Sequence, residues 1–389
     1  MPPREPRRRS PESAVYRLPA NSSAPSCSPF FTGTRAMESP TEASSEAPGR
    51  RGAAARCWRV VRASDGSVRG GVAAWYRDAH DESAAASDVL VRVEAAGFNY
   101  KDALACTGHP GVMRVTPLVP GIDAAGTLVG AAAGLPDGAP VVVTGNQMGE
   151  TRDGGFATHL RMPAAAVLPR PAGLSAAEAM ALGTAGLTAL LACDRLDRLV
   201  DQRHARTDEE WLVTGASGGV GMLAVACLAA SGRRVVACTR KPAAAAALAA
   251  LGAAAVAAPE ELVDSSPKSL ASGRWGGVVD TVGGRLLADV LRSVRTGGAV
   301  AAIGMAGGSD LPTTVHPFIL RGVTLAGIDA ATQPTQAERL VLWSRLAALW
   351  PRLRDRFPVV RLPLDAVGQR AAALLRGETI GRAVVIPDL

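Results

Sequence analysis

The sequence predicts an α/β protein with a β-rich, barrel-like part and a doubly wound parallel sheet. Three observations support this. The chain has 389 residues, which is too long for one ordinary core. From residue 57 to about 173, short β-type runs are separated by Gly and Pro. From residue 174, helical segments alternate with short apolar strands, a pattern typical of a parallel sheet covered by helices.

The β-rich part is predicted from short apolar runs and turn residues. Strands are expected at residues 58–61, 89–93 and 141–143. Pro136, Asp137 and Gly138 form a turn signal before the last of these strands. Many short strands separated by Gly- and Pro-containing turns favour a barrel-like domain.

The α/β part begins with a helix start signal. Ser175 can cap a helix, and Glu178 three residues later completes a capping box. Strands are then expected at residues 211–213, 234–237, 277–279 and 299–303. A final helix at 335–348 and a closing strand at 382–386 follow.

The composition is that of a globular protein, with 48% hydrophobic and 20% charged residues. The six cysteines form no CxxC pair and are expected to be free thiols in a reducing compartment. The most apolar stretch, residues 176–192, contains Glu178 and is expected to be a buried helix and not a membrane span. Part of the net charge of +7 lies in Arg7, Arg8 and Arg9. These arginines are not followed by a segment in which basic and aromatic residues alternate, so a nucleic-acid partner is disfavoured.

Residues 1–55 are expected to be a disordered extension. They are rich in Pro, Ser, Arg and Ala and lack the periodicity needed to bury apolar surface. The first 36 residues contain six Arg and two Glu, as in an organelle transit peptide. The alternatives are an ordinary disordered tail and a true start of the protein at Met37. The protein is accordingly expected in the cytoplasm or, if the extension is a transit peptide, in a mitochondrion or plastid.

A glycine-rich loop is the most informative segment. Gly215, Gly218 and Gly221 recur every three residues between an apolar strand and the helix expected at 222–230. Glycines let the backbone approach a diphosphate, and the helix N-terminus offers free N–H groups to it. Strand, loop and helix together make this a strong dinucleotide-binding signal. The expected cofactor-binding residues of the loop are Gly215, Ala216, Ser217, Gly218, Gly219, Val220 and Gly221.

The next strand favours NADPH over NADH. It ends in Thr239, Arg240 and Lys241, and no Asp or Glu occurs from Trp211 to Pro259. The adenosine ribose therefore lacks a carboxylate from this region, whereas two cations and a hydroxyl are offered to a 2′-phosphate. The alternative is that both cations are solvated surface charges.

Two later loops follow strands of the expected parallel sheet, at residues 280–284 and 304–308. Loops at the carboxyl ends of such strands line the cofactor crevice. Gly283 and Gly304 either bring backbone close to the cofactor or serve simple turns.

Four segments together resemble a known family. They are residues 97–108 with Asn99-Tyr100-Lys101-Asp102, residues 120–127, residues 183–189, and residues 213–221. These resemble the quinone oxidoreductase-like medium-chain dehydrogenase/reductases. Residues 311–321 and the Asn99–Asp102 motif narrow the resemblance to the acryloyl-CoA reductase subgroup, over about residue 57 to the C-terminus.

The resemblance implies a GroES-like catalytic domain, formed by residues 56–173 and 330–389, around a Rossmann NADP-binding domain at 174–329. It also implies a homodimer, for which residues 323–327 are the expected sheet edge. The zinc dehydrogenases of the same superfamily carry a Cys where Asn99 and Tyr100 stand and a His-Glu pair at Ile122-Asp123, so no zinc is expected. One departure from the subgroup is Asp153 where a Trp often precedes Gly-Gly, which could alter the substrate mouth.

Without zinc, the expected reaction is reduction of a double bond conjugated to a carbonyl or thioester. Hydride reaches the β-carbon, and donors must stabilise the enolate. Asn99 is the expected orienting donor, and Tyr100 a donor, proton relay or packing residue. Thr184 is expected to contact the nicotinamide or cap a helix turn.

Further roles are expected for charged residues. Lys101, Asp102 and Asp123 are expected to form a buried pair that fixes the loop. Arg114 and Arg321 are candidates for CoA phosphates, whereas the resemblance implies that Arg382 touches the dinucleotide.

The predicted function is NADPH-dependent reduction of acryloyl-CoA or a related enoyl-CoA. A broad quinone or alkenal reductase is an alternative. A non-catalytic NADPH-binding protein with a structural or sensing role is an alternative of another class.

Overall fold

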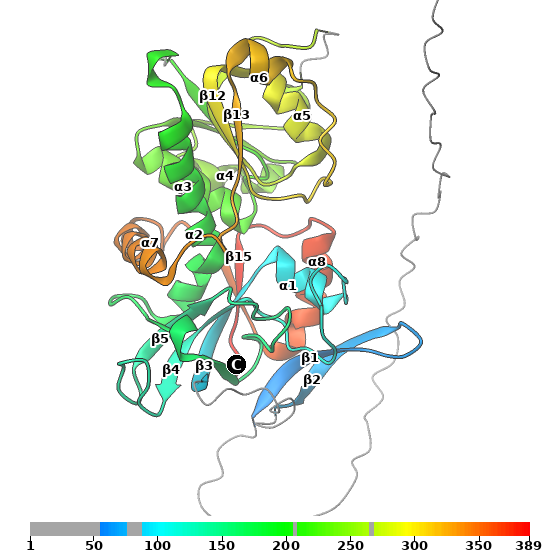
Figure 1. The fold of residues 1–389 in the computed structure, drawn as a ribbon, viewed down its shortest axis with the longest axis vertical. Coiled ribbons are helices and arrows are strands. Elements are labelled where there is room, and N and C mark those ends of the chain that lie inside the picture. The colour runs from blue at the N-terminus through cyan, green and yellow to red at the C-terminus, as the bar shows by residue number, and fades with distance from the viewer. Residues whose placement is uncertain (1–54, 76–87, 205–207, 264–267) are drawn as a thin grey trace, which may run out of the picture. The chain divides into compact units, whose positions relative to one another are not determined.

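The computed structural model describes residues 55–75, 88–204, 208–263 and 268–389 (Figure 1). The predicted N-terminal extension, its transit-peptide interpretation and Met37 lie outside the described residues. The described strands form a seven-stranded and a six-stranded sheet, at opposite ends of the ribbon in Figure 1, and a separate two-stranded hairpin.

The first sheet is built from both ends of the described chain. Its seven strands are β14 (Val359–Leu362), β15 (Arg382–Val385), β3 (Asp88–Phe98), β4 (Asp123–Val129), β5 (Pro140–Thr144) and β7 (Leu168–Pro169) in that order, with β6 (His159–Pro163) also paired to β3. Along β3, buried Val91 and Val93 flank exposed Arg92, the alternation of a half-buried strand. A hairpin of β1 (Arg56–Arg62) and β2 (Val68–Ala74) and the helices α1 (Tyr100–Cys106) and α8 (Val367–Leu375) belong to the same end of the molecule.

The second sheet is parallel and has six strands. Their order is β10 (Ala255–Ala257), β9 (Arg234–Cys238), β8 (Glu210–Val213), β11 (Trp275–Asp280), β12 (Val294–Ala302) and β13 (Thr324–Gly327). In order of appearance this is the 3-2-1-4-5-6 arrangement of dinucleotide-binding sheets, whose switch point lies beside the first strand, here β8. Its helices are α3 (Gly219–Ala230), α4 (Ala245–Ala250), α5 (Gly284–Arg292) and α6 (His316–Arg321).

One long helix joins the two parts. Helix α2 (Ala176–Leu199) packs against β3, β4 and β15 at one end and against α3, β12 and α7 (Gln336–Leu349) elsewhere. Ser175 caps it, and the Glu178 carboxylate accepts from the Ser175 backbone N–H and hydroxyl at 2.9 and 2.8 Å, as predicted. Among the described helices, α2 is long and apolar enough to span a membrane, but it is mostly buried inside the protein. Because α2 serves both cores, the predicted domain limits at 174 and 330 stay predictions.

Short 3₁₀ turns complete the described elements, at Ala164–Ala166, Gln202–His204, Pro242–Ala244, Pro259–Leu262, Trp350–Arg352 and Leu364–Ala366. The strands and long helices expected from the sequence are all present, with ends that differ by a few residues.

Candidate active site and cofactor crevice

The glycine-rich loop connects β8 to α3 at the switch point of the parallel sheet. Gly215 has a φ of +60°, and a Cβ there would collide with the Thr281 hydroxyl. A Cβ at Gly221 would lie 2.5 Å from the Gly215 carbonyl oxygen, so the loop can close tightly onto the helix only with glycine at both positions.

The N-terminus of α3 has the features of a phosphate site. The helix has 12 residues and begins after Gly218, without a side-chain cap, so its first N–H groups have no capping partner. A Cβ at Gly218 would meet nothing nearer than 3.4 Å, which leaves the approach to these N–H groups open. Uncapped N–H groups and the positive end of the helix dipole together favour a diphosphate here.

A cluster of cations lies at the end of β9. The Thr239 hydroxyl donates to the Ser217 hydroxyl at 2.9 Å, and both residues are buried. Lys241 follows, with a pKa lowered by burial and by the charges of Arg240 and Arg370. Like charges gather where an anion can offset their repulsion, which supports the predicted 2′-phosphate site.

Arg370, on α8, is a member of this cluster that the sequence did not reveal. Its pKa is lowered by burial and by the charge of Arg382, and its Nε is buried without a hydrogen-bond partner. It comes from the other end of the chain, so no local pattern could connect it with Lys241.

Gly283 and Gly304 shape the two loops that follow β11 and β12. Gly283 has a φ of +72°, and a Cβ there would lie 2.8 Å from the Gly308 carbonyl oxygen. A Cβ at Gly304 would collide with the Thr281 carbonyl. Both glycines are therefore required by packing of one loop against the other, and contact with a cofactor stays a prediction.

A buried polar network centred on Asp123 lies next to the cofactor loop. The Asn99 amide donates to the Asp123 carboxylate at 2.8 Å. Thr184 donates to the same carboxylate from its backbone N–H at 3.0 Å and from its hydroxyl at 2.5 Å. Asp102, also buried, accepts from the backbone N–H of Asn99 at 2.7 Å and of Ile122 at 2.9 Å.

Arg382 supplies the positive charge of this network. Its guanidinium donates to the Asn99 side-chain oxygen at 2.9 Å and lies 3.7 Å from the Asp123 carboxylate. It also donates to three backbone carbonyls, those of Phe98, Met180 and Ala181. The Arg382 side chain packs against Gly219 of the cofactor loop, where a Cβ would collide with its Cδ. The hydrogen bonds of the guanidinium are thus directed into the protein, while the side chain packs against the loop that would hold the dinucleotide.

These contacts leave Asn99 without a free donor, whereas the role expected for Tyr100 stays a prediction. The side-chain NH₂ of Asn99 donates to Asp123 at 2.8 Å and to Asp102 at 3.2 Å, so both of its hydrogens are engaged inside the protein. Tyr100 is 40% exposed at the start of α1. Thr184 is bound to Asp123, just after the kink that Gly183 introduces in α2 with a φ of +47°.

We expected Lys101 to be the cation that pairs with Asp102 and Asp123, and this prediction was wrong. The Lys101 ammonium lies 2.6 Å from the Glu150 carboxylate, and Arg382 takes the place beside the two aspartates. The two aspartates do fix the loop before α1, as expected, through Asn99.

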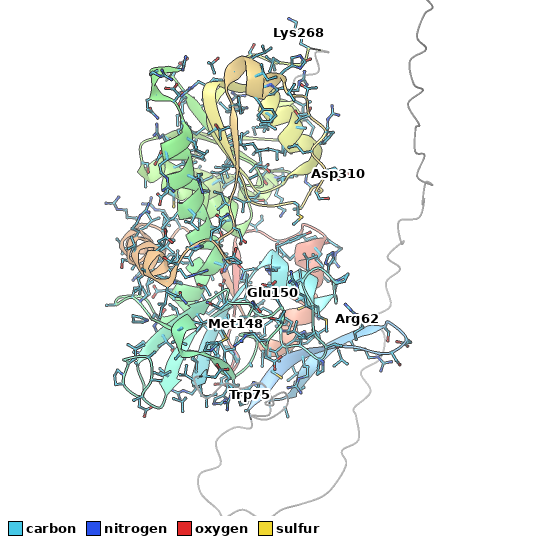
Figure 2. All side chains as sticks on the ribbon, in the orientation of Figure 1. Arg62, Trp75, Met148, Glu150, Lys268 and Asp310 are labelled. Carbon is cyan, nitrogen blue, oxygen red and sulfur yellow. The ribbon has the colours of Figure 1, made fainter. Side chains whose placement is uncertain are left out.

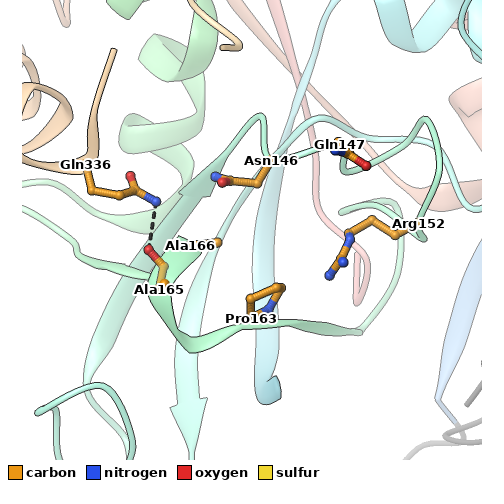
Figure 3. Close-up of a pocket in the computed structure, with 7 residues that line it drawn as sticks. All are labelled: Asn146, Gln147, Arg152, Pro163, Ala165, Ala166 and Gln336. Atoms are coloured by element: carbon orange, nitrogen blue, oxygen red, sulfur yellow. Dashed lines mark hydrogen bonds between the residues drawn. The ribbon is translucent and has the colours of Figure 1, made fainter. Parts of the chain in front are cut away.

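A cavity of about 610 Å³ lies beside this network. It is lined by α1, by the loop after β5 and by the segment before α7, and Lys101, Arg114, Glu150, Asp329 and Arg339 contribute its charged groups. A neighbouring cavity of about 340 Å³ shares Asn146, Gln147 and Gln336 with it (Figure 3). There the Gln336 amide donates to the Ala165 carbonyl at 2.8 Å.

The two arginines expected to bind CoA phosphates lie in different places. Arg114 lines the larger cavity, where a phosphorylated substrate could reach it. The guanidinium of Arg321 donates to the backbone carbonyls of Arg292, Val294 and Ala271, at the far end of the parallel sheet. Arg321 therefore serves the fold there, and we leave it out of the proposed substrate site.

Comparison with known proteins places the chain in a family. Residues 85–172 match the alcohol dehydrogenase GroES-like domain, and residues 219–345 match the zinc-binding dehydrogenase family. The acrylyl-CoA reductase AcuI of Ruegeria pomeroyi is 42% identical over 300 residues, which are 77% of this chain and 89% of that protein. The chain belongs to the medium-chain dehydrogenase/reductases, in the quinone oxidoreductase-like branch that contains the acrylyl-CoA reductases.

Two further members of this branch are informative. The putative quinone oxidoreductase YhfP of Bacillus subtilis is 41% identical over 263 residues, 67% of this chain and 78% of that protein. The crystal structure of Escherichia coli YhdH with bound NADPH has a TM-score of 0.76 and 37% identity, and covers 85% of this chain and 99% of that one. The predicted family and the GroES-like plus Rossmann fold class are confirmed.

Among the described residues, no group of three or more His, Cys, Asp or Glu side chains is placed to hold a metal ion. At the positions that the sequence compares with zinc ligands, Asn99 and Asp123 are instead joined by a hydrogen bond.

Proposed function

We propose that this protein is an NADPH-dependent reductase of the activated double bond of acryloyl-CoA or a related enoyl-CoA. The observation that carries the proposal is the charged cavity of about 610 Å³ beside α1, which is lined by Lys101 and Arg114. Cations suit a thioester substrate that carries several phosphates and develops negative charge as it reacts. The relationship to AcuI supports the same substrate class.

The residues of the crevice fit NADPH. The glycine loop and the uncapped α3 N-terminus suit the diphosphate, and Arg240, Lys241 and Arg370 suit the 2′-phosphate. When bound, NADPH supplies the hydride. The chain itself positions the two partners and stabilises the charge that develops on the substrate oxygen.

We infer that the reaction needs no zinc. The two oxygens of Asp123 accept from Asn99 and Thr184 and face Arg382, so the position is saturated by protein groups. A reduction that passes through an enolate requires donors and a proton source, and amines, hydroxyls and water can provide both.

A quinone or alkenal reductase is the second candidate, because YhfP is nearly as similar as AcuI. The two candidates share fold, cofactor and cavity, and they differ in whether the phosphates of CoA contribute to binding. Arg114 is the residue that separates them, since it would matter for acryloyl-CoA and not for a simple quinone.

The test is oxidation of NADPH by the purified full-length chain, followed at 340 nm, with acryloyl-CoA and 1,4-benzoquinone in parallel. The proposal expects a higher kcat/KM for acryloyl-CoA, propionyl-CoA as the product by mass spectrometry, and much lower rates with NADH. A preference for the quinone would move the function to the second candidate. NADPH binding without turnover of either substrate would favour the non-catalytic alternative.

We also infer a homodimer. Strand β13 is the outermost strand of the six-stranded sheet, and α6 beside it exposes Ile319 by 72% and Leu320 by 62%. An unpaired edge next to exposed apolar residues suits pairing with a second copy of this chain.

A further inference from the structure

The larger cavity is built by three segments that are distant in sequence. Lys101 and Arg114 border it from α1 and the loop that follows, Glu150 from the loop after β5, and Asp329 from the segment before α7. Figure 2 shows Glu150 close to α1, near the junction between the two ends of the molecule. The cavity therefore brings together charged groups from α1, from the loop after β5 and from the segment before α7.

Most polar groups around this cavity have their hydrogen-bonding capacity used by the fold. The guanidinium of Arg339 donates to the Thr144 hydroxyl and to the carbonyls of Ala330 and Ala331. The side-chain amide of Asn146 donates to the Thr144 carbonyl at 3.0 Å. These groups can shape the site but have few donors left for a substrate.

Lys101 differs from them. Its side chain is 33% exposed, and its ammonium carries three hydrogens, of which one is directed to Glu150 at 2.6 Å. Two N–H donors therefore remain on a side chain that lines the cavity. Because Lys101 follows Asn99 by two residues, it stands beside the network that Arg382 ties to Gly219 of the cofactor loop.

Glu150 is held firmly enough to orient the lysine. Its side chain is only 13% exposed, its backbone N–H donates to the Gln147 carbonyl, and its own carbonyl accepts from the Arg114 N–H, both at 3.1 Å. Two residues in the same loop, Asn146 and Gln147, have positive φ angles of 53° and 64°. Non-glycine residues adopt this conformation rarely, and it concentrates at functional sites.

We propose that Lys101, oriented by Glu150, donates a hydrogen bond to the carbonyl oxygen of the substrate and stabilises the enolate. This inference rests on the proposed function and replaces Asn99 as the expected donor. As hydride bonds to the β-carbon, the electrons of the C=C bond shift to form a C=C bond to the carbonyl carbon, and the carbonyl oxygen becomes negative. Lys101 offsets that charge. A proton from water then bonds to the α-carbon, the C=O bond is restored, and the products are NADP⁺ and the saturated thioester.

The test compares Lys101→Met, Lys101→Arg and Glu150→Gln with the wild type. Loss of one oxyanion donor costs about 10²- to 10³-fold in kcat, so we expect that loss for Lys101→Met. Lys101→Arg keeps the charge and should recover much of the activity, and Glu150→Gln should lie between. The matched control is Lys268→Met, the same change at an exposed lysine at the far end of the parallel-sheet domain (Figure 2).

A second readout separates chemistry from structure. With NADPH deuterated at the transferred position, Lys101→Met should show a larger isotope effect on kcat than the wild type, because hydride transfer becomes slower. Its Kd for NADPH, from protein fluorescence, and its Tm should match those of the wild type. A wild-type kcat and isotope effect in Lys101→Met would overturn the inference alone, as would a loss explained by a changed Kd or Tm. A wild type that reduces neither acryloyl-CoA nor an enone would overturn the proposed function and this inference with it.

Discussion

The buried carboxyl of Asp102 gives the fold a measurable dependence on pH. Asp102 is fully buried, and burial, together with the charge of Asp123, raises its pKa to about 7, although N–H donors from Asn99 and Ile122 oppose the shift. In the unfolded chain the ordinary value of 3.8 applies. Between these values the folded protein holds a proton that the unfolded chain has lost. The stabilisation is therefore complete below the unfolded pKa and disappears as the pH rises to the folded value.

The size of the effect follows from the shift. One proton bound only by the folded state makes the free energy of unfolding fall by at most about 1.4 kcal/mol per pH unit. The shift covers roughly three pH units, so the total is about 4 kcal/mol at most.

Urea unfolding between pH 5 and 7, followed by tryptophan fluorescence, measures this slope in a range where ordinary carboxylates are already ionised. Asp102→Asn cannot titrate, so its unfolding free energy should change less with pH than that of the wild type. Asp365→Asn, the same change at an exposed carboxylate, is the matched control and should keep the wild-type slope. Parallel curves for wild type and Asp102→Asn would refute the reasoning, because they would mean that Asp102 is ionised in the folded protein throughout.

Three further predictions follow from the site and the surface. Lys241→Met should raise the Kd for NADPH about 10- to 100-fold, as expected for one lost charge-assisted hydrogen bond, and leave the Kd for NADH unchanged. Calorimetry measures both constants, and equal losses of affinity for the two cofactors would contradict a 2′-phosphate contact. Arg382→Met should destabilise the protein by about 3–5 kcal/mol, because the buried Asp123 carboxylate loses its neighbouring cation. A Tm within error of the wild-type value would refute this prediction. Ile319→Glu should turn a dimer into a monomer in light scattering, with the Kd for NADPH retained, and an unchanged mass would exclude this surface from the interface.

The elements whose signals are local were predictable from the sequence. The glycine spacing of the cofactor loop, the Ser175–Glu178 capping box and the alternating apolar runs each depend on neighbours within one element. The parallel sheet was expected from the alternation of helices and strands, whereas the order of its strands is known only from the structure. Signals of this local kind are sufficient to predict the fold class.

The centre of the site was less predictable, because its partners are far apart in sequence. Arg382 and Asn99 are separated by 283 residues, and no motif connects them. The error about Lys101 has a different origin. Neighbouring residues on a helix point about 100° apart, so Lys101 and Asp102, both in the first turn of α1, cannot face the same partner. Asp102 points inward to the network, and Lys101 points to Glu150.

Because neighbouring side chains point in different directions, residues of the Asn99–Asp102 motif have different roles. Asn99 and Asp102 hold the loop to the buried network, and Lys101 between them lines the cavity. A substitution in the motif should therefore affect either stability or turnover, depending on which face of α1 it changes. Asp102→Asn tests the first face through unfolding and Lys101→Met the second through kcat. If both variants lost stability and activity together, the division between a structural and a catalytic face of α1 would fail.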